Sequence, residues 1–327
     1  MLKRYQNYTV LANAVICSVI GLMGWLYAGC QPPPPVPASP TALALSPTAT
    51  VPIAATAPVA AAWDAVTTWA YQLTGYQNNR LDEIAASPYD LVVIDLAHDG
   101  SSDYFTLAEI RNVQATGKIV LAYFEIGAIE NYRPEWAITP DELILGPVSG
   151  WPDEHYVRYW DPRWWPIVQG RIDQALAAGF DGAYLDMVTA YQEISTAVAG
   201  MDETARARAM VDLIVAVSAY AKSHNPGFKI VPQNAPELYL WPGYLEAMDG
   251  LGMEELHFLA TDEPCAADWC AANRAAALAV RAAGKLILTV DYATQPQNIR
   301  DAYTQSRADG FVPYVTTVEL DWLSNHP

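Results

Sequence analysis

Two apolar runs in the chain end on a carboxylate, in a pattern that suits acid–base chemistry. One run, GFDGAYLD, ends at Asp186, and the other, GLGME, ends at Glu254. Because side chains alternate between the two faces of a strand, Gly182 and Tyr184 share the face of Asp186, and two glycines share the face of Glu254. We expect the glycines to leave room for a substrate beneath each carboxylate.

Paired carboxyl groups are what glycoside hydrolysis requires, one as the acid and one as the nucleophile or base. Other hydrolytic arrangements are not indicated, because the chain has no Gly-x-Ser-x-Gly elbow and no evident Ser-His-Asp order. The five histidines are scattered without ligand spacing, so we expect neither a metal nor a cofactor. Carboxylates beside Tyr and Trp suit a carbohydrate, since aromatic rings stack on sugar faces.

Further polar residues follow other apolar runs, where they could bind a substrate. They are Gln72, Asp95, Glu125, Asn234, Glu255 and Asp291. Asp95 and Asp291 are the rival catalytic carboxylates. Each also has a structural interpretation, because Asp95 could cap the helix that follows and Asp291 could pair with an arginine. Glu255 should point away from Glu254 unless the strand has already ended.

Eight apolar runs recur between helical segments, and five of them follow a glycine that could end a helix. The runs cover residues 69–73, 91–97, 118–126, 180–187, 228–235, 250–256, 285–292 and 311–317. This alternation predicts an α/β fold, a (β/α)₈ TIM barrel, whose polar strand ends meet on one face. The alternative, a doubly wound open sheet, should carry a Gly-rich phosphate loop after its first strand, and none is present.

Two helices are indicated most clearly. The stretch from Asp202 to Lys222 is the longest helical pattern. Asp161-Pro162 is typical of a helix start, as cap and first-turn proline, and Gly179 is typical of the end of that helix.

Several segments resemble glycoside hydrolase family 114. They are YQL (71–73), VVIDLAHDG (92–100), GKIVLAYFEIGAIENYRPEW (117–136), WPDEHYVRYWDPRW (151–164), GFDGAYLDMV (179–188), PQNA (232–235) and MEELHF (253–258). The resemblance implies a TIM barrel with endo-α-1,4-polygalactosaminidase activity. It also implies that Asp186 is the nucleophile and Glu254 the general acid/base.

The third-strand motif of that family is only partly matched. The family pattern usually reads Ser-Ile-Gly-Glu-Ala-Glu, whereas this chain reads Glu-Ile-Gly-Ala-Ile-Glu over residues 125–130. Glu125 therefore stands at the serine position and Ala128 at that of the first glutamate. The resemblance retains Tyr123, Glu130, Tyr132 and Arg133 as substrate-binding or site-shaping residues, and we add Tyr184 from the strand of Asp186.

The formal charge of −18 on 327 residues argues against nucleic acid as a partner, because an acidic chain repels phosphate backbones. Residues 1–62 contain Lys3 and Arg4 and no acidic side chain, so all 36 acidic residues lie in the remainder. A cleft lined by such carboxylates would attract a cationic polysaccharide, such as a partly deacetylated galactosamine polymer. The alternative is that the acidic surface only aids solubility.

The N-terminal segment is typical of a targeting sequence. Lys3 and Arg4 precede an uncharged apolar stretch that ends Ala-Gly-Cys at Cys30. Residues 1–30 therefore predict either a lipoprotein signal, with Cys30 lipidated, or an uncleaved membrane anchor. Residues 31–62, rich in Pro, Ala and Thr, predict a disordered linker, and residues 63–327 the glycosidase domain. Both interpretations place the domain outside the cytoplasmic membrane, tethered to it.

Cys265 and Cys270 are the two cysteines of that domain, and we expect them to form a disulfide in an oxidising compartment. Two alternative functions remain open from the sequence. One is a glycosidase acting on another α-glycan, and the other is a surface protein that binds carbohydrate without cleaving it.

Overall fold

The computed structural model describes residues 62–325 of the chain. Eight parallel strands form two ladders, β1-β2-β3-β7-β8 and β9-β12-β13, and the pairing of Gln233 with Gly252 joins β8 to β9. The eight strands are β1 (Trp69–Tyr71), β2 (Leu91–Asp95), β3 (Ile119–Glu125), β7 (Gly182–Asp186), β8 (Lys229–Pro232), β9 (Gly250–Glu254), β12 (Leu286–Tyr292) and β13 (Val312–Thr316). Each lies within one of the eight predicted runs, which confirms the α/β fold with a parallel sheet.

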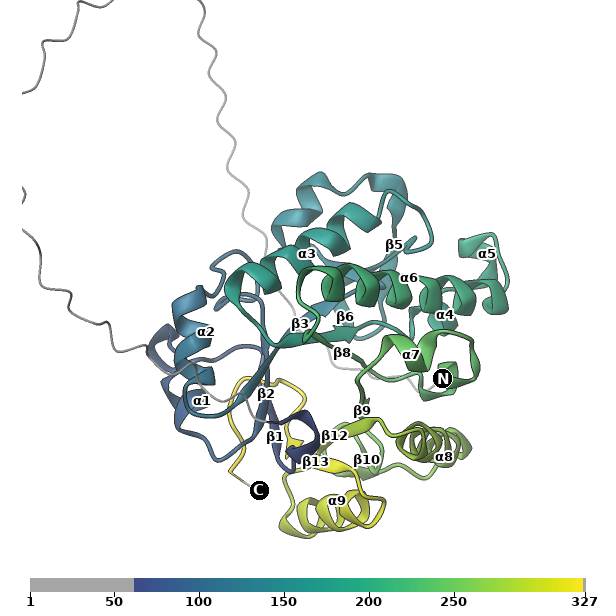
Figure 1. The fold of residues 1–327 in the computed structure, drawn as a ribbon. Coiled ribbons are helices and arrows are strands. Elements are labelled where there is room, and N and C mark those ends of the chain that lie inside the picture. The colour runs from purple at the N-terminus through teal and green to yellow at the C-terminus, as the bar shows by residue number, and fades with distance from the viewer. Residues whose placement is uncertain (1–61, 326–327) are drawn as a thin grey trace, which may run out of the picture. The chain divides into compact units, whose positions relative to one another are not determined.

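The helices lie outside these strands (Figure 1). They are α1 (Asp82–Ala86), α2 (Leu107–Gln114), α3 (Trp165–Ala178), α4 (Ala190–Glu193), α5 (Thr196–Ala199), α6 (Glu203–His224), α7 (Tyr244–Ala247), α8 (Asp268–Ala282) and α9 (Pro296–Ala308). Short 3₁₀ turns are η1 (Trp63–Ala65), η2 (Gln77–Asn79), η3 (Pro134–Ile138), η4 (Asp141–Leu143) and η5 (Pro236–Leu240). Within the described part of the chain, no helix follows β13.

The predicted helix over 202–222 is confirmed as α6, whose cap Asp202 accepts the N–H of Ala205 at 2.8 Å. The predicted start of α3 at Asp161-Pro162 is wrong. Asp161 instead forms a turn, because its carboxylate accepts the backbone N–H and the guanidinium of Arg163. The helix begins only at Trp165 and ends, as predicted, at Gly179, which has a φ of 83°.

Two additions interrupt the repeat, and neither was predicted. After β3 the chain forms an antiparallel sheet of β4 (Ala128–Glu130), β5 (Ile144–Val148) and β6 (Trp151–Val157) before α3 begins. After β9 it forms a hairpin of β10 (Phe258–Leu259) and β11 (Glu263–Pro264), followed by the Cys265–Cys270 disulfide. Both additions follow the carboxyl ends of barrel strands, where they can contribute to a site.

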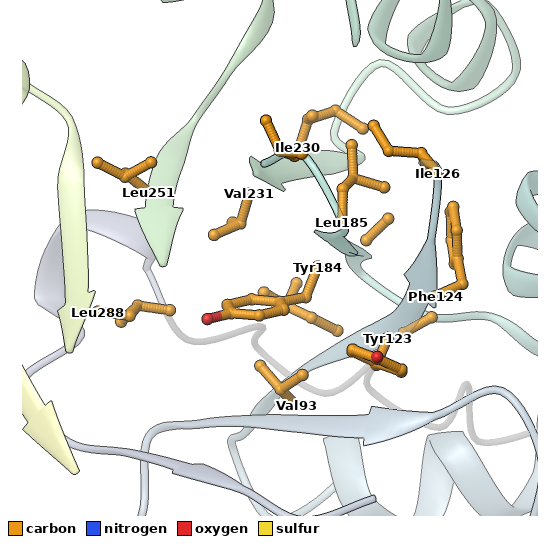
Figure 2. Close-up of a cluster of buried hydrophobic side chains, with 14 of the residues drawn as sticks. Val93, Tyr123, Phe124, Ile126, Tyr184, Leu185, Ile230, Val231, Leu251 and Leu288 are labelled. Atoms are coloured by element: carbon orange, nitrogen blue, oxygen red, sulfur yellow. The ribbon is translucent and has the colours of Figure 1, made fainter. Parts of the chain in front are cut away.

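Side chains fill the space enclosed by the eight strands, as Figure 2 shows for Val93, Tyr184, Val231 and Leu288. The ring of Tyr184 stacks against Trp69 and lies 5.2 Å from that of Tyr71, centroid to centroid. A Cβ on Gly252 would stand 2.1 Å from the Tyr184 hydroxyl oxygen. The expectation that the glycine beneath Glu254 leaves room for a substrate is therefore wrong, since Tyr184 occupies that space.

The same correction holds for the other two glycines of these strands. A Cβ on Gly182 would meet the backbone oxygen of Lys229 at 2.4 Å, and one on Gly250 would meet the ring of Trp63 at 3.2 Å. These glycines permit close packing inside the barrel, so any substrate must bind above the strand ends.

Residues 1–61, which include the predicted leader, Cys30 and nearly all of the predicted linker, lie outside the described residues. Among the helices of residues 62–325, none is long and apolar enough to cross a membrane.

Candidate active site

Asp186 is the last residue of β7, and both of its carboxyl oxygens accept a hydrogen bond. Oδ2 accepts from the Tyr123 hydroxyl at 2.8 Å, and Oδ1 accepts from the N–H of Met187 at 2.6 Å. Gly127 helps to place this turn, because a Cβ there would lie 2.1 Å from the Met187 oxygen. The carboxylate is therefore fixed by β3 on one side and by its own turn on the other.

Glu254 is the last residue of β9, the strand that follows β8 in the sheet. Its Oε1 accepts from the Tyr292 hydroxyl at 2.5 Å, and its Oε2 accepts from the Asn234 amide at 3.2 Å. Asn234 also accepts the N–H of Glu254 at 2.9 Å and adopts a left-handed backbone, with a φ of 61°. Asn234 thus connects β8 to β9 and orients the acid.

The two carboxyl groups titrate at different pH values. Burial raises the pKa of Asp186 to about 6, against the opposing hydrogen bonds from Met187 and Tyr123. Burial, and then the charge of Asp186, raise the pKa of Glu254 to about 7. An ionised Asp186 therefore favours the protonated form of Glu254.

A second set of carboxyl groups lies beside Asp186. Burial, then the charges of Glu130 and Glu154, raise the pKa of Glu125 well above its ordinary value. Burial raises the pKa of Glu154 to about 8, and the charge of Asp186 adds to this. Burial also opposes ionisation of Glu130, but the charge and hydrogen bond of Arg133 outweigh it and lower its pKa. Glu125, which stands at the serine position of the resembled pattern, is therefore harder to ionise than an ordinary glutamate.

The other predicted residues are held by protein partners. Asp95 is buried and receives both terminal nitrogens of Arg133, at 2.9 and 2.7 Å, and Arg133 also binds Glu130 at 2.8 Å. The Gln72 amide donates to the backbone oxygen of Thr74 at 2.9 Å. Asp95 therefore pairs with an arginine and also accepts the N–H of Ala97, two residues on. The interpretation that Asp95 caps the following helix is wrong, because the cap of α2 is Thr106.

Asp291 does not pair with an arginine, as one interpretation had it, but accepts the backbone N–H groups of His257 and Phe258 at 2.7 and 2.9 Å. Glu255 has a φ of 54°, so the strand has ended there, and its Oε1 accepts the N–H of Ala260 at 2.6 Å. The structure brings Tyr123, Asn234 and the carboxyl groups of Glu125, Glu130 and Glu154 to the two central carboxylates, those of Asp186 and Glu254. It does not bring Asp291 to them.

The remaining predicted features concern the cysteines and metal ligands. Cys265 and Cys270 form a disulfide with Cα atoms 5.9 Å apart. In the described part of the chain, no three His, Cys, Asp or Glu side chains are arranged to hold a metal ion.

The family profile of glycoside-hydrolase family GH114 matches residues 50–327 of the chain. The chain belongs to family GH114 and is a glycoside hydrolase. An uncharacterized protein of Deinococcus radiodurans is 37% identical over 267 residues, covering 80% of this chain and 84% of its own length. An uncharacterized protein of Methanocaldococcus jannaschii is 32% identical over 276 residues, covering 78% of each chain.

Two solved structures share the fold. That of Aspergillus fumigatus Ega3 in complex with galactosamine has a TM-score of 0.64 at 17% identity, covering 81% of this chain and 97% of that one. The glycoside hydrolase domain of PelA from Pseudomonas aeruginosa also has a TM-score of 0.64 at 17% identity, covering 80% and 98%. At this level of identity the likeness shows that the barrel is that of known glycoside hydrolases.

Three residues that contact or act on the two central carboxylates were not singled out by the sequence. Tyr292 donates to Glu254, Glu154 joins the acids beside Asp186, and the charge of Glu193 acts on Asp186. The register of β12 on β9, which the sequence leaves open, brings Tyr292 to Glu254, because Val290 pairs with Glu254 and Tyr292 lies on the same face of β12 as Val290. Nothing in the local pattern indicated Glu154, since it comes from the unpredicted strand β6.

Proposed function

We propose that this GH114 protein cleaves α-1,4-linked polysaccharide that contains galactosamine, with Asp186 as nucleophile and Glu254 as general acid/base. The observation that carries the roles is that burial, and then the charge of Asp186, raise the pKa of Glu254, so an ionised nucleophile at Asp186 favours a protonated acid at Glu254. Tyr123 and Met187 hold the Asp186 carboxylate, while Tyr292 and Asn234 aim Glu254.

The reaction we infer has two steps and retains the anomeric configuration. Asp186 Oδ attacks the anomeric carbon while Glu254 gives its proton to the leaving glycosidic oxygen, which forms a glycosyl ester and releases the first product. Glu254, now ionised, then takes a proton from water, whose oxygen displaces Asp186. The galactosamine bound in the Ega3 structure supports a substrate that contains aminosugars.

The purified protein should release oligosaccharides from partly deacetylated galactosaminogalactan, faster than from the fully acetylated polymer. Proton NMR should show the α-anomer as the first product, whereas the β-anomer would indicate inversion. Cleavage of a neutral α-glycan at a greater rate would favour the alternative glycosidase. Binding of the polymer without any product would favour the non-catalytic alternative.

Activity should follow a bell-shaped pH profile with its maximum between the two pKa values. The rate rises as pH increases through the pKa of Asp186, about 6, because the nucleophile becomes ionised. It falls as pH increases through the pKa of Glu254, about 7, because the acid loses its proton. Initial rates across the pH range on one oligosaccharide check this, and a rate independent of pH would contradict the two roles.

We also propose that the domain acts outside the cytoplasmic membrane, tethered through residues 1–30 and the linker of residues 31–62. The charge pattern of the leader and its Cys30 support this. Recovery of the protein in the cytosolic fraction of source cells would contradict it.

A further inference from the structure

A hollow that contains none of the predicted site residues lies among the loops after three barrel strands. Its volume is about 350 Å³, and its lining residues are Gln192, Glu237, Trp269, Ala272 and Asn273. Gln192 belongs to α4 after β7, Glu237 to η5 after β8, and Trp269 to α8 after β9. β7 ends in Asp186, β8 precedes Asn234, and β9 ends in Glu254. The hollow therefore lies at the same end of the barrel as these three residues.

Two residues that line the hollow lie close in sequence to residues that act on Asp186 and Glu254. Gln192 is adjacent to Glu193, whose charge raises the pKa of Asp186. Glu237 is three residues beyond Asn234, the amide that binds Glu254, and three residues span at most about 10 Å. A polymer bound across Asp186 and Glu254 can therefore extend into the hollow.

Trp269 provides an aromatic surface on a fixed backbone. Its side chain is 47% exposed, although most large apolar residues of the domain are buried. The next residue, Cys270, is buried and bonded to Cys265, and this closes the short loop that leads into α8. Because the disulfide restrains this turn, the exposed indole is presented to the hollow at little entropic cost.

Polar groups complete the lining. The Tyr191 hydroxyl and the Gln192 amide both donate to Oε1 of Glu237, so that carboxylate is oriented before any ligand binds. Asn273 stands four residues after Trp269 on α8 and therefore faces the same side of that helix. An indole beside a carboxylate and two amides has the groups that bind a sugar ring, its hydroxyls and an amine.

We propose that this hollow is a subsite for a further aminosugar unit of the polymer, with its ring on Trp269 and its ammonium group at Glu237. The proposal rests on the proposed function and specifies how far the substrate extends beyond the cleaved bond. A carboxylate favours the amine over an acetamide, because only the amine carries a positive charge. The indole face also attracts that cation.

The test is the dependence of cleavage on chain length for α-1,4-galactosamine oligomers, from the dimer upward. Trp269→Ala should lower kcat/KM about tenfold for long oligomers, equivalent to ~1.4 kcal/mol, through KM. It should leave the shortest cleaved oligomers unaffected, and Trp269→Tyr should restore most of the loss. Glu237→Gln should weaken the preference of long oligomers for free amines over acetamides. Leu278→Ala, at another exposed position on α8, is the matched control and should behave as the wild type.

An unchanged chain-length dependence in Trp269→Ala would overturn the subsite while leaving the proposed function intact. If the wild type cleaves no galactosamine oligomer, the proposed function fails. The subsite is then tested by measuring how tightly oligomers bind. Calorimetric titration of the Asp186→Asn protein, with and without Trp269→Ala, serves for this. Weaker oligomer binding in the double variant supports an aminosugar pocket, whereas equal binding, or none in either, overturns it.

Discussion

Asp186→Asn and Glu254→Gln should each reduce polymer cleavage by about 10³-fold or more while the protein stays folded. Both substitutions keep the shape of the side chain. The oxygen of the new amide can still accept the N–H of Met187 or the amide of Asn234. Its NH2 group can donate to the hydroxyl of Tyr123 or Tyr292, which can accept in place of donating. Asp186→Asn removes the nucleophile, and Glu254→Gln removes the proton donor. Initial rates measured on the polymer, with circular dichroism to check folding, test both losses.

The two losses should differ on an activated substrate. An aryl glycoside with a nitrophenol leaving group needs little protonation, so Glu254→Gln should keep the first step on it and Asp186→Asn should not. Asp291→Asn is the matched control, because burial also raises the pKa of Asp291 to about 6, yet its carboxylate accepts backbone N–H groups of His257 and Phe258. Full activity in either catalytic variant, or a large loss in Asp291→Asn, would contradict the assignment.

The eight strands could be predicted because their signals are local. An apolar run after a glycine identifies a strand without knowledge of its neighbours, and the left-handed φ of 92° at Gly117 and 85° at Gly284 matches that interpretation. The same reasoning placed Asp186 and Glu254 at strand ends. It did not predict β4, β5 and β6, because this insertion follows no repeat of the barrel.

The partners of the site residues depend on register and packing, which the sequence pattern leaves open. Asp291 and Tyr292 are adjacent at the end of β12, but only Tyr292 shares a face with the residue paired to Glu254. Gly252 is small because Tyr184 approaches from another strand, which no run of β9 indicates. Arg133 was expected near the substrate, and the buried carboxylates that it binds come from β2 and β4.

Arg133→Met should lower the free energy of unfolding by about 3–5 kcal/mol at neutral pH. Arg133 gives both terminal nitrogens to Asp95 and one of them to Glu130, and all three side chains are buried. Its removal leaves two buried carboxylates without the arginine that binds them, and a domain is stable by only about 5–15 kcal/mol in total. Urea unfolding followed by tryptophan fluorescence measures the loss.

The pH dependence of that loss identifies its cause. In the wild type the pKa of Glu130 is lowered, so its contribution to stability is present above the unfolded pKa and is lost as pH falls. Burial already raises the pKa of Asp95 in the wild type, against the opposing charge of Arg133. Without Arg133 the pKa of Asp95 is raised further and that of Glu130 is no longer held down by this arginine, so the variant loses more stability than the wild type as pH rises through the unfolded values. The two effects add, and the difference between variant and wild type should widen from acidic to neutral pH. Arg208→Met, which breaks an exposed pair with Asp212, is the control and should show almost no loss at any pH. A pH-independent loss in Arg133→Met would mean that packing, and not the buried charges, holds the arginine in place.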